Sequence, residues 1–224
     1  MTDLAFLQRL PLFETLTEQE LSEISTMLTI KNYQKGSTLF WEKEEGNELF
    51  IIRSGAVKIY RQEDSREIIL ALFNEGDFFG EMAMFGDNHV RSASANTLEK
   101  TTVYILKRDD FLYLLAKSPD IFIKILNTTL ERLRRANELI ADLAMNSAYP
   151  RIARLLIRLL EDHKGKQVVR PKLTHNQIAD MTATSRETVT KILSEMQNKG
   201  QIEIVNRQII VSDLGALKSA AAIT

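Results

Sequence analysis

The chain has 224 residues, of which 44% are hydrophobic and 26% charged, as is usual for a globular protein. It contains no cysteine, which excludes disulfides, thiolate metal sites and iron–sulfur clusters. No run of residues is apolar over the roughly 20 positions needed to cross a bilayer, and the N-terminus has no basic signal region, so we expect a cytoplasmic protein without membrane contact.

The formal net charge of −1 conceals an asymmetry along the chain. Residues 148–224 hold 12 Lys and Arg against 7 Asp and Glu, whereas residues 1–147 hold 17 against 23. A basic C-terminal part indicates contact with a polyanion, although the solvated faces of many proteins have a similar composition.

The N-terminal part predicts helix followed by strands. Residues 1–26 favour one or two short helices, with Thr17 as an N-cap and Glu20 completing a capping box. Residues 27–107 contain short apolar or alternating runs, such as LFIIRSGAVKIY and REIILALF, separated by glycines. This pattern is typical of antiparallel strands joined by glycine turns, in a small barrel or jelly roll.

One segment of the predicted barrel, FGEMAMFGDNHVRSASANT, groups charged and hydroxyl side chains. The carboxylate of Glu81 follows Gly80, and ten residues later Arg91 stands beside Ser92. We expect this segment to bind a small anionic ligand. The alternative is that Glu81 and Arg91 form an ion pair that braces a turn of the barrel.

Residues 119–147 predict one long helix without internal glycine or proline. Apolar and small residues follow it at spacings that alternate between three and four: Leu126, Thr129, Leu133, Ala136, Ile140, Leu143 and Ser147. This heptad seam favours a parallel homodimer. The alternative is a helix that packs the same stripe against its own domain.

A separate C-terminal domain is expected after Tyr149-Pro150, because the proline disfavours helix at the residue before it. A helix is predicted over residues 151–165, ended by Gly165. Two short helices follow in THNQIADMT and SRETVTKILSEMQNKG, and then a hairpin whose two apolar runs flank Asn206. Three helices and a small hairpin predict a winged helix-turn-helix.

The second of these short helices is the most specific signal in the chain. Thr174 and Ser185 stand where each helix needs an N-cap. The exposed face of the second helix is expected to present Arg186, Glu187, Thr188, Thr190 and Lys191. Arginine and lysine can donate to guanine and glutamate can accept from cytosine, while Ser185, Thr188 and His175 suit phosphate contacts. The alternative is an ordinary helical hairpin with a charged surface.

Together these motifs resemble the cyclic-AMP receptor family of bacterial transcription regulators, within the superfamily that includes the fumarate–nitrate regulators. The resemblance covers almost the whole chain: LPLFETLTEQEL is similar to the opening helix, GNELFIIRSGAVKIY to the first barrel hairpin, GEMAMFGDNHVRSA to the phosphate-binding cassette and SRETVTKIL to the recognition helix. It implies an α+β fold, with a cyclic-nucleotide-binding jelly-roll β-barrel in residues 1–118, a dimerisation helix in residues 119–147 and a winged helix-turn-helix in residues 148–224.

The resemblance also implies an effector, cyclic AMP in the first place or another cyclic nucleotide. Its phosphate and ribose would lie against Gly80, Glu81, Arg91, Ser92 and Ala93, with Glu81 accepting from the ribose 2′-hydroxyl. On the dimer helix, Ala136 and Asn137 stand where the family has two hydroxyl residues that meet the adenine. Only Asn137 can form hydrogen bonds there.

For the DNA side, Arg186, Glu187 and Lys191 fall on the three base-reading positions of the family, the third of which is usually arginine. The resemblance implies palindromic DNA with TGTGA-like half-sites, read most weakly at the base facing Lys191, and RNA polymerase as a possible further partner. Ala183 stands where the family's turn usually has glycine; if its φ is positive, alanine costs about 1 kcal/mol.

Two rival functions remain. The first is a constitutive DNA-binding regulator with a degenerate or differently liganded pocket. The second is an enzyme that uses Glu81 and Arg91 on a nucleotide, such as a phosphodiesterase, but the chain has no metal-ligand spacing or nucleophile motif, so no enzyme is predicted. His89 is a candidate haem ligand, yet a loop histidine is more often solvated, and no metal, haem or iron–sulfur cluster is expected.

Overall fold

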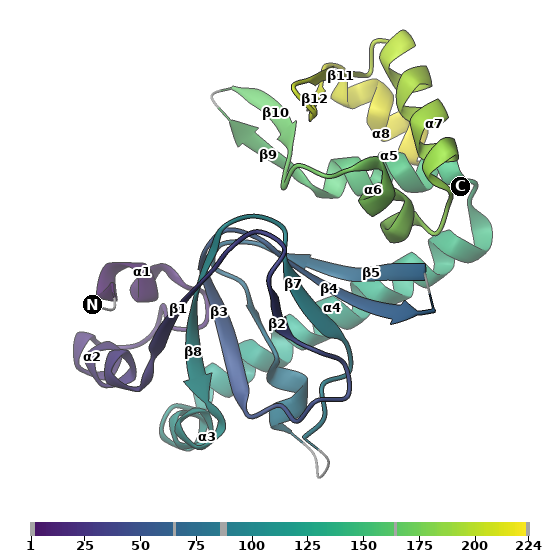
Figure 1. Cartoon of the computed structure of the whole chain (residues 1–224). Helices are drawn as coiled ribbons and strands as arrows, with labels where there is room; N and C mark the ends of the chain where they lie inside the picture. Colours follow the sequence, from purple (N-terminus) through teal and green to yellow (C-terminus); the bar gives the residue numbers. More distant parts are fainter. Residues whose placement is uncertain (1–2, 65, 86–88, 164, 223–224) are drawn as a thin grey trace. The chain divides into compact units, whose positions relative to one another are not determined.

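The computed structural model describes residues 3–64, 66–85, 89–163 and 165–222 (Figure 1). The chain divides into two compact units. The first comprises residues 1–64 and 70–133, and the second comprises residues 65–69 and 134–224. The long helix α4 (Pro119–Met145) contributes residues to both.

The N-terminal half is built on two four-stranded sheets, ordered β1-β8-β3-β6 and β2-β7-β4-β5. Their strands are β1 (Thr29–Tyr33), β2 (Thr38–Phe40), β3 (Glu48–Ser54), β4 (Val57–Glu63), β5 (Arg66–Phe73), β6 (Phe78–Phe79), β7 (Ser94–Thr97) and β8 (Thr101–Lys107). The β1/β8, β3/β8, β3/β6, β2/β7 and β4/β7 pairs are antiparallel. The predicted jelly roll is confirmed.

Strand β3 has buried residues on both of its faces. Phe50 and Ile52 belong to the core of the barrel, where Phe50 stacks on Phe79 with ring centroids 5.2 Å apart. Leu49 and Ile51 belong to a second core that the strand shares with the N-terminal helices. Because successive side chains of a strand alternate between its faces, one apolar run serves both cores.

Helices α1 (Leu4–Arg9), α2 (Glu18–Met27), α3 (Arg108–Lys117) and the first part of α4 contribute to this second core. The predicted capping box is present: the Thr17 hydroxyl accepts from the Glu20 amide at 3.3 Å, and the Glu20 carboxylate accepts from the Thr17 amide at 2.8 Å. On α4, Ile121 and Ile125 are buried against the same core.

The second unit contains the rest of α4 together with α5 (Ala148–Arg158), α6 (His175–Thr182), α7 (Arg186–Asn198) and α8 (Leu214–Ala222). Four short strands form a sheet in the order β11-β12-β10-β9: β9 (Leu160–His163), β10 (Lys166–Val169), β11 (Ile202–Val205) and β12 (Gln208–Val211). Asn206 and Arg207 join β11 to β12 with φ of 49° and 63°, as a type I′ hairpin turn requires. The winged helix-turn-helix is confirmed.

Two predictions about the start of this unit are wrong in detail. The helix expected over residues 151–165 is replaced after Arg158 by the β9–β10 hairpin, with Gly165 in its turn at φ 78°. The run of leucines at residues 159–160 continues the helical pattern, but β10 pairs with both β9 and β12 and so gains sheet hydrogen bonds.

The helix break also lies earlier than the Tyr149-Pro150 pair. Helix α4 ends at Met145, and α5 begins at Ala148. Pro150 is accommodated in the first turn of α5, where the missing N–H has no intrahelical partner. Within the described ranges, no helix is long and apolar enough to cross a membrane.

Candidate functional site

The turn that carries the predicted anion-binding residues is shaped by two glycines. Gly80 has φ 90°, and a Cβ on it would lie 2.7 Å from Nη1 of Arg91 and 2.9 Å from the carbonyl oxygen of Glu48. A Cβ on Gly46 would lie 2.5 Å from Nε of Arg91. Larger residues at either position would therefore displace the guanidinium.

Arg91 is 4% exposed and is held in place by the barrel. Its Nη1 donates to the carbonyl of Gly80 at 3.0 Å and its Nη2 to the carbonyl of Glu48 at 2.9 Å, while the guanidinium lies over the ring of Phe40 at 4.2 Å. Its buried Nε has no hydrogen-bond partner among the described residues. Burial lowers the pKa of Arg91, opposed by the nearby carboxylates of Glu48, Glu81 and Glu44.

Glu81 begins a short 3₁₀ helix, η1 (Glu81–Met84), and is 5% exposed. Its Oε1 accepts from Nη1 of Arg132 on α4 at 2.9 Å, and Nη2 of Arg132 donates to the carbonyl of Phe78 at 2.5 Å. The Arg132 guanidinium also lies over the ring of Phe73 at 4.4 Å. The alternative of a Glu81–Arg91 ion pair is wrong, because Glu81 pairs with Arg132 of α4 instead.

These contacts fit a phosphate-bearing ligand at Arg91. A guanidinium has five N–H donors, and the orphaned Nε is one that a phosphate oxygen could accept from. Ser92 is exposed, with the sulfur of Met82 at 3.8 Å from its hydroxyl, whereas Ala93 is buried. Gly80, Glu81, Arg91, Ser92 and Ala93 thus lie within one part of the barrel.

The remaining candidates around the barrel have simpler surroundings. Asn137 is exposed on the part of α4 that belongs to the second unit. The ring of His89 donates from Nδ1 to the carbonyl of Ala83 at 3.2 Å. Among the described residues, no three histidine, aspartate or glutamate side chains gather as the ligands of a metal ion would.

The helix-turn-helix is set by its two N-caps and its turn. The Thr174 hydroxyl accepts from the Gln177 amide at 3.2 Å, and the Ser185 hydroxyl accepts from the Thr188 amide at 3.1 Å, so both predicted caps are confirmed. Ala183 has φ 46° and ψ 53°, so the residue at this turn does adopt a positive φ.

The recognition helix α7 is divided between an apolar and a polar face. Val189, Ile192, Leu193 and Met196 are buried, whereas Arg186, Glu187, Thr190 and Lys191 are exposed and Thr188 is partly so. The pKa of Glu187 is lowered by hydrogen bonds from its own backbone N–H and from Ser185, so its carboxylate is ionised. A charged array at the N-terminal end of a helix can enter the major groove of DNA.

Two family models match this arrangement: a cyclic nucleotide-binding domain over residues 30–118 and a Crp-like helix-turn-helix domain over residues 150–220. Over 92% of its length the chain is 32% identical to the CRP-like cAMP-activated global transcriptional regulator of Mycobacterium tuberculosis, 94% of which it covers. The chain belongs to the Crp–Fnr superfamily of transcription regulators.

Two further proteins are similar to this Crp–Fnr chain, one in sequence and one in fold. It is 29% identical to the cyclic AMP receptor protein of Thermus thermophilus, in an alignment that covers 94% of this chain and 96% of that protein. The structure of FixK2 from Bradyrhizobium japonicum has the same fold, with a TM-score of 0.78, 23% identity and coverage of 88% of this chain and 98% of that one. The superfamily consists of regulators and not of enzymes.

Arg132 is the residue of this Crp–Fnr site that the sequence analysis missed. It lies seven residues after Ile125 and eleven after Ile121, on the inward stripe of α4. A cation at a core-facing helical position is a signal that it has a buried partner, and this spacing could have drawn attention to it.

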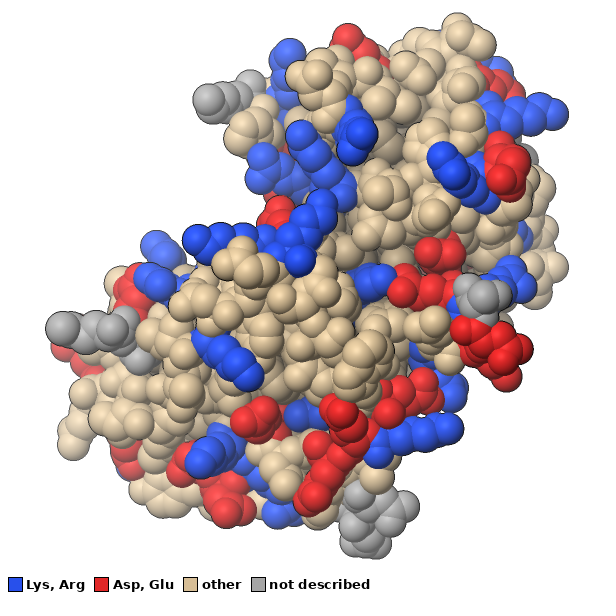
Figure 2. Space-filling model, in the orientation of Figure 1, with Lys and Arg blue, Asp and Glu red and all other residues tan. Residues whose placement is uncertain are grey.

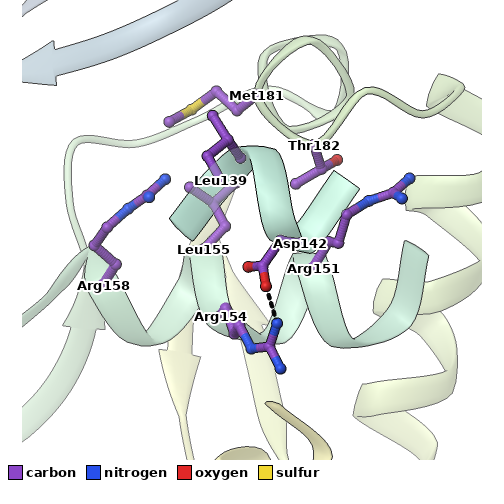
Figure 3. A pocket seen from close by; sticks show the side chains of 8 residues that line it. All are labelled: Leu139, Asp142, Arg151, Arg154, Leu155, Arg158, Met181 and Thr182. Carbon is purple, nitrogen blue, oxygen red and sulfur yellow. Dashed lines mark hydrogen bonds and ion pairs between the residues drawn. The ribbon is translucent and has the colours of Figure 1, made fainter. Parts of the chain in front are cut away.

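The junction between α4 and α5 is fastened by two arginines (Figure 3). Nη1 of Arg154 donates to the Asp142 carboxylate and its Nε donates to the carbonyl of Ala221 at 2.7 Å, which ties the end of α8 to α4. Nη1 of Arg151 donates to the carbonyl of Asn146 at 2.8 Å. Leu139, Leu155, Arg158, Met181 and Thr182 complete the lining of a small pocket of about 20 Å³.

Proposed function

We propose that this Crp–Fnr chain is a homodimeric regulator whose affinity for DNA is controlled by a cyclic nucleotide, with cyclic AMP as the first choice. The observation that carries the effector proposal is Arg91, a buried guanidinium fixed by two carbonyls with one donor left unpartnered among the described residues. Such a regulator acts on DNA, which places it in the cytoplasm.

In this proposal each side chain of the effector site has one role. Arg91 and the Ser92 hydroxyl hold the phosphate, and the Glu81 carboxylate accepts from the ribose 2′-hydroxyl. Arg132 neutralises Glu81 and lies on α4, so it connects the pocket to the dimer helix. Asn137 would meet the base.

Dimerisation is supported by an apolar face of α4 that is exposed in the single chain. Leu126, Leu133, Ile140 and Leu143 of the heptad seam are 40–65% exposed, as are Phe122, Ile123 and Leu130 nearby. Thr129 and Ala136 also belong to the seam and are exposed, whereas Ser147 lies beyond the end of α4 as the N-cap residue of α5. A second copy of the helix, packed in parallel, would cover these side chains.

DNA recognition is assigned to α7. Arg186 and Glu187 would read base edges and Lys191 a third position, while Thr174, His175, Ser185 and Thr188 would contact phosphates. Two such helices in a dimer would read half-sites about 34 Å apart. We expect palindromic TGTGA-like half-sites with RNA polymerase as a further partner.

One observation favours the rival, a regulator that binds DNA constitutively. Glu81 already has a cationic partner, and Arg91 already donates to two carbonyls, so the pocket is braced by protein groups. A braced pocket needs no ligand for stability. Catalysis is not part of the proposal.

Titration calorimetry with cyclic AMP and cyclic GMP separates these two candidates. The regulator predicts saturable binding to the wild type and a large loss in Arg91→Gln, with Arg61→Gln as the control because the Arg61 side chain is 60% exposed. Mass spectrometry of small molecules released from the purified protein would identify a different effector. If neither nucleotide gives a heat of binding and the purified protein releases no small molecule, the constitutive DNA-binding regulator is favoured.

The base-reading assignment is tested by selecting duplexes from a random pool. The expected product is an inverted repeat of TGTGA-like half-sites with the weakest preference at the base facing Lys191. Arg186→Ala should lose on the order of 1–3 kcal/mol of discrimination at one base pair. A uniform loss over all sequences would make Arg186 a phosphate contact instead.

A further inference from the structure

His175 connects the two helices of the helix-turn-helix motif. It is the first residue of α6, and its Nδ1 lies 2.8 Å from Oγ1 of Thr190 on the recognition helix α7. The same hydroxyl lies 2.9 Å from the backbone carbonyl of Arg186. His175 is therefore on the surface that presents the base-reading side chains.

The two contacts of Thr190 determine where the imidazole carries its proton. A carbonyl oxygen only accepts, so the single hydrogen of the Thr190 hydroxyl is donated to Arg186. The hydroxyl oxygen then accepts from His175, which requires a proton on Nδ1. A neutral imidazole has only one N–H, so its Nε2 is an acceptor.

The first helix of this motif crosses the DNA backbone, whose anionic phosphate oxygens offer His175 only acceptors. We propose that His175 contacts a DNA phosphate through Nε2 only as an imidazolium, which donates from both ring nitrogens, so that DNA affinity rises as the pH falls. This inference rests on the DNA-binding function proposed above and adds a pH dependence to it.

The charges around the ring set how protonation and DNA binding are coupled. On α7 they are Arg186 and Glu187, one turn before Thr190, and Lys191 beside it; on α6 the first is Asp180. A DNA phosphate adds negative charge at the same surface, so binding of DNA and of the proton support each other.

The test uses the full-length protein and a duplex with two inverted TGTGA half-sites, at about pH 6 and about pH 8, between which histidine changes charge. Wild-type affinity should rise roughly five- to tenfold at the lower pH if each subunit gains one surface ion pair. The slope of log K against log salt should steepen by about 0.9 for each imidazolium, or about 1.8 for a dimer.

Three variants separate this contact from other effects of pH. His175→Gln keeps a polar side chain but should lose both the gain in affinity and the steeper salt slope. His163→Gln is the matched control, since His163 lies on strand β9, and it should keep both. Thr190→Val removes the acceptor for Nδ1, so the neutral ring can carry its proton on Nε2, and the pH dependence should shrink while binding persists.

Nitrogen NMR of the ring in the DNA-free protein gives a readout independent of affinity. The expected neutral form is Nδ1–H in the wild type and Nε2–H in Thr190→Val. An Nε2–H ring in the wild type, or an undiminished pH gain in His175→Gln, overturns the inference while leaving DNA binding intact. If the wild-type protein does not bind the duplex at either pH value, the proposed DNA-binding function itself is refuted.

Discussion

Ala183 shows how a single residue can carry measurable strain. It adopts φ 46° at the turn of the helix-turn-helix, where its amide donates to the carbonyl of Ala179. A left-handed conformation costs a residue with a Cβ roughly 1–2 kcal/mol, whereas glycine adopts it freely. The turn therefore keeps its geometry at a cost that the surrounding caps and apolar contacts offset.

Ala183→Gly should stabilise the second unit by on the order of 0.5–1 kcal/mol, because the relief of strain exceeds the added flexibility of the unfolded chain. Hydrogen exchange in α6 and α7 would measure this change. The matched control, Ala179→Gly inside α6, should destabilise by about 1 kcal/mol. Equal effects of the two variants would contradict the strain at Ala183.

Glu81 and Arg132 form a largely buried ion pair, with side chains 7% and 23% exposed. Removing one partner leaves the other charge poorly solvated. Each single substitution should therefore lower the free energy of unfolding more than the double substitution does. A double-mutant cycle with Glu81→Gln and Arg132→Gln should give a coupling energy on the order of 1–3 kcal/mol. Additive urea-unfolding free energies would show that the pair contributes nothing.

At the level of elements, α4 combines two faces with different roles. Ile121 and Ile125 pack on the core of the first unit, and Arg132 pairs with Glu81, whereas the heptad seam is exposed. An ordinary surface helix would not expose several large apolar side chains in register. The same helix can thus contact the effector site and a partner.

Ile140→Asp should dissociate the dimer, because Ile140 is 65% exposed in the single chain and would lie at the seam of the pair. Sedimentation equilibrium would follow the shift to monomer. The control is Ala141→Asp, which introduces the same charge at an exposed position next to the seam. Dissociation by both variants, or by neither, would argue against this seam.

The contact of α8 with the rest of its unit depends on Arg154. Leu217, Ala220 and Ala221 of this helix are buried. Nε of Arg154 donates to the backbone carbonyl of Ala221. Arg154→Met should increase hydrogen exchange in α8, whereas Arg158→Met should not. Similar exchange in both variants would show that apolar packing alone holds the helix.

For the whole molecule, the sequence predicted the parts that depend on local chemistry. The caps at Thr17, Thr174 and Ser185 and the hairpin around Asn206 follow from neighbouring residues. The domain order also follows from changes in hydrophobic period. These features need no knowledge of distant contacts.

The features that escaped prediction depend on partners far along the chain. Strands β9 and β10 form because β12 is available to pair with β10. Spacing along α4 could single out Arg132 as a cation with a buried partner, but it could not show that this partner is Glu81, 51 residues away. The face in Figure 2 carries acidic and basic side chains intermixed over the β-rich part.

In the proposed mechanism, a ligand bound in the barrel changes the affinity of the winged helix-turn-helix for DNA. Fluorescence anisotropy of a labelled TGTGA palindrome, at zero and saturating cyclic AMP, tests it most directly. We expect cyclic AMP to tighten DNA binding by about 5- to 150-fold in the wild type and not in Arg91→Gln. Equal DNA affinity of the wild type with and without saturating cyclic AMP would contradict it.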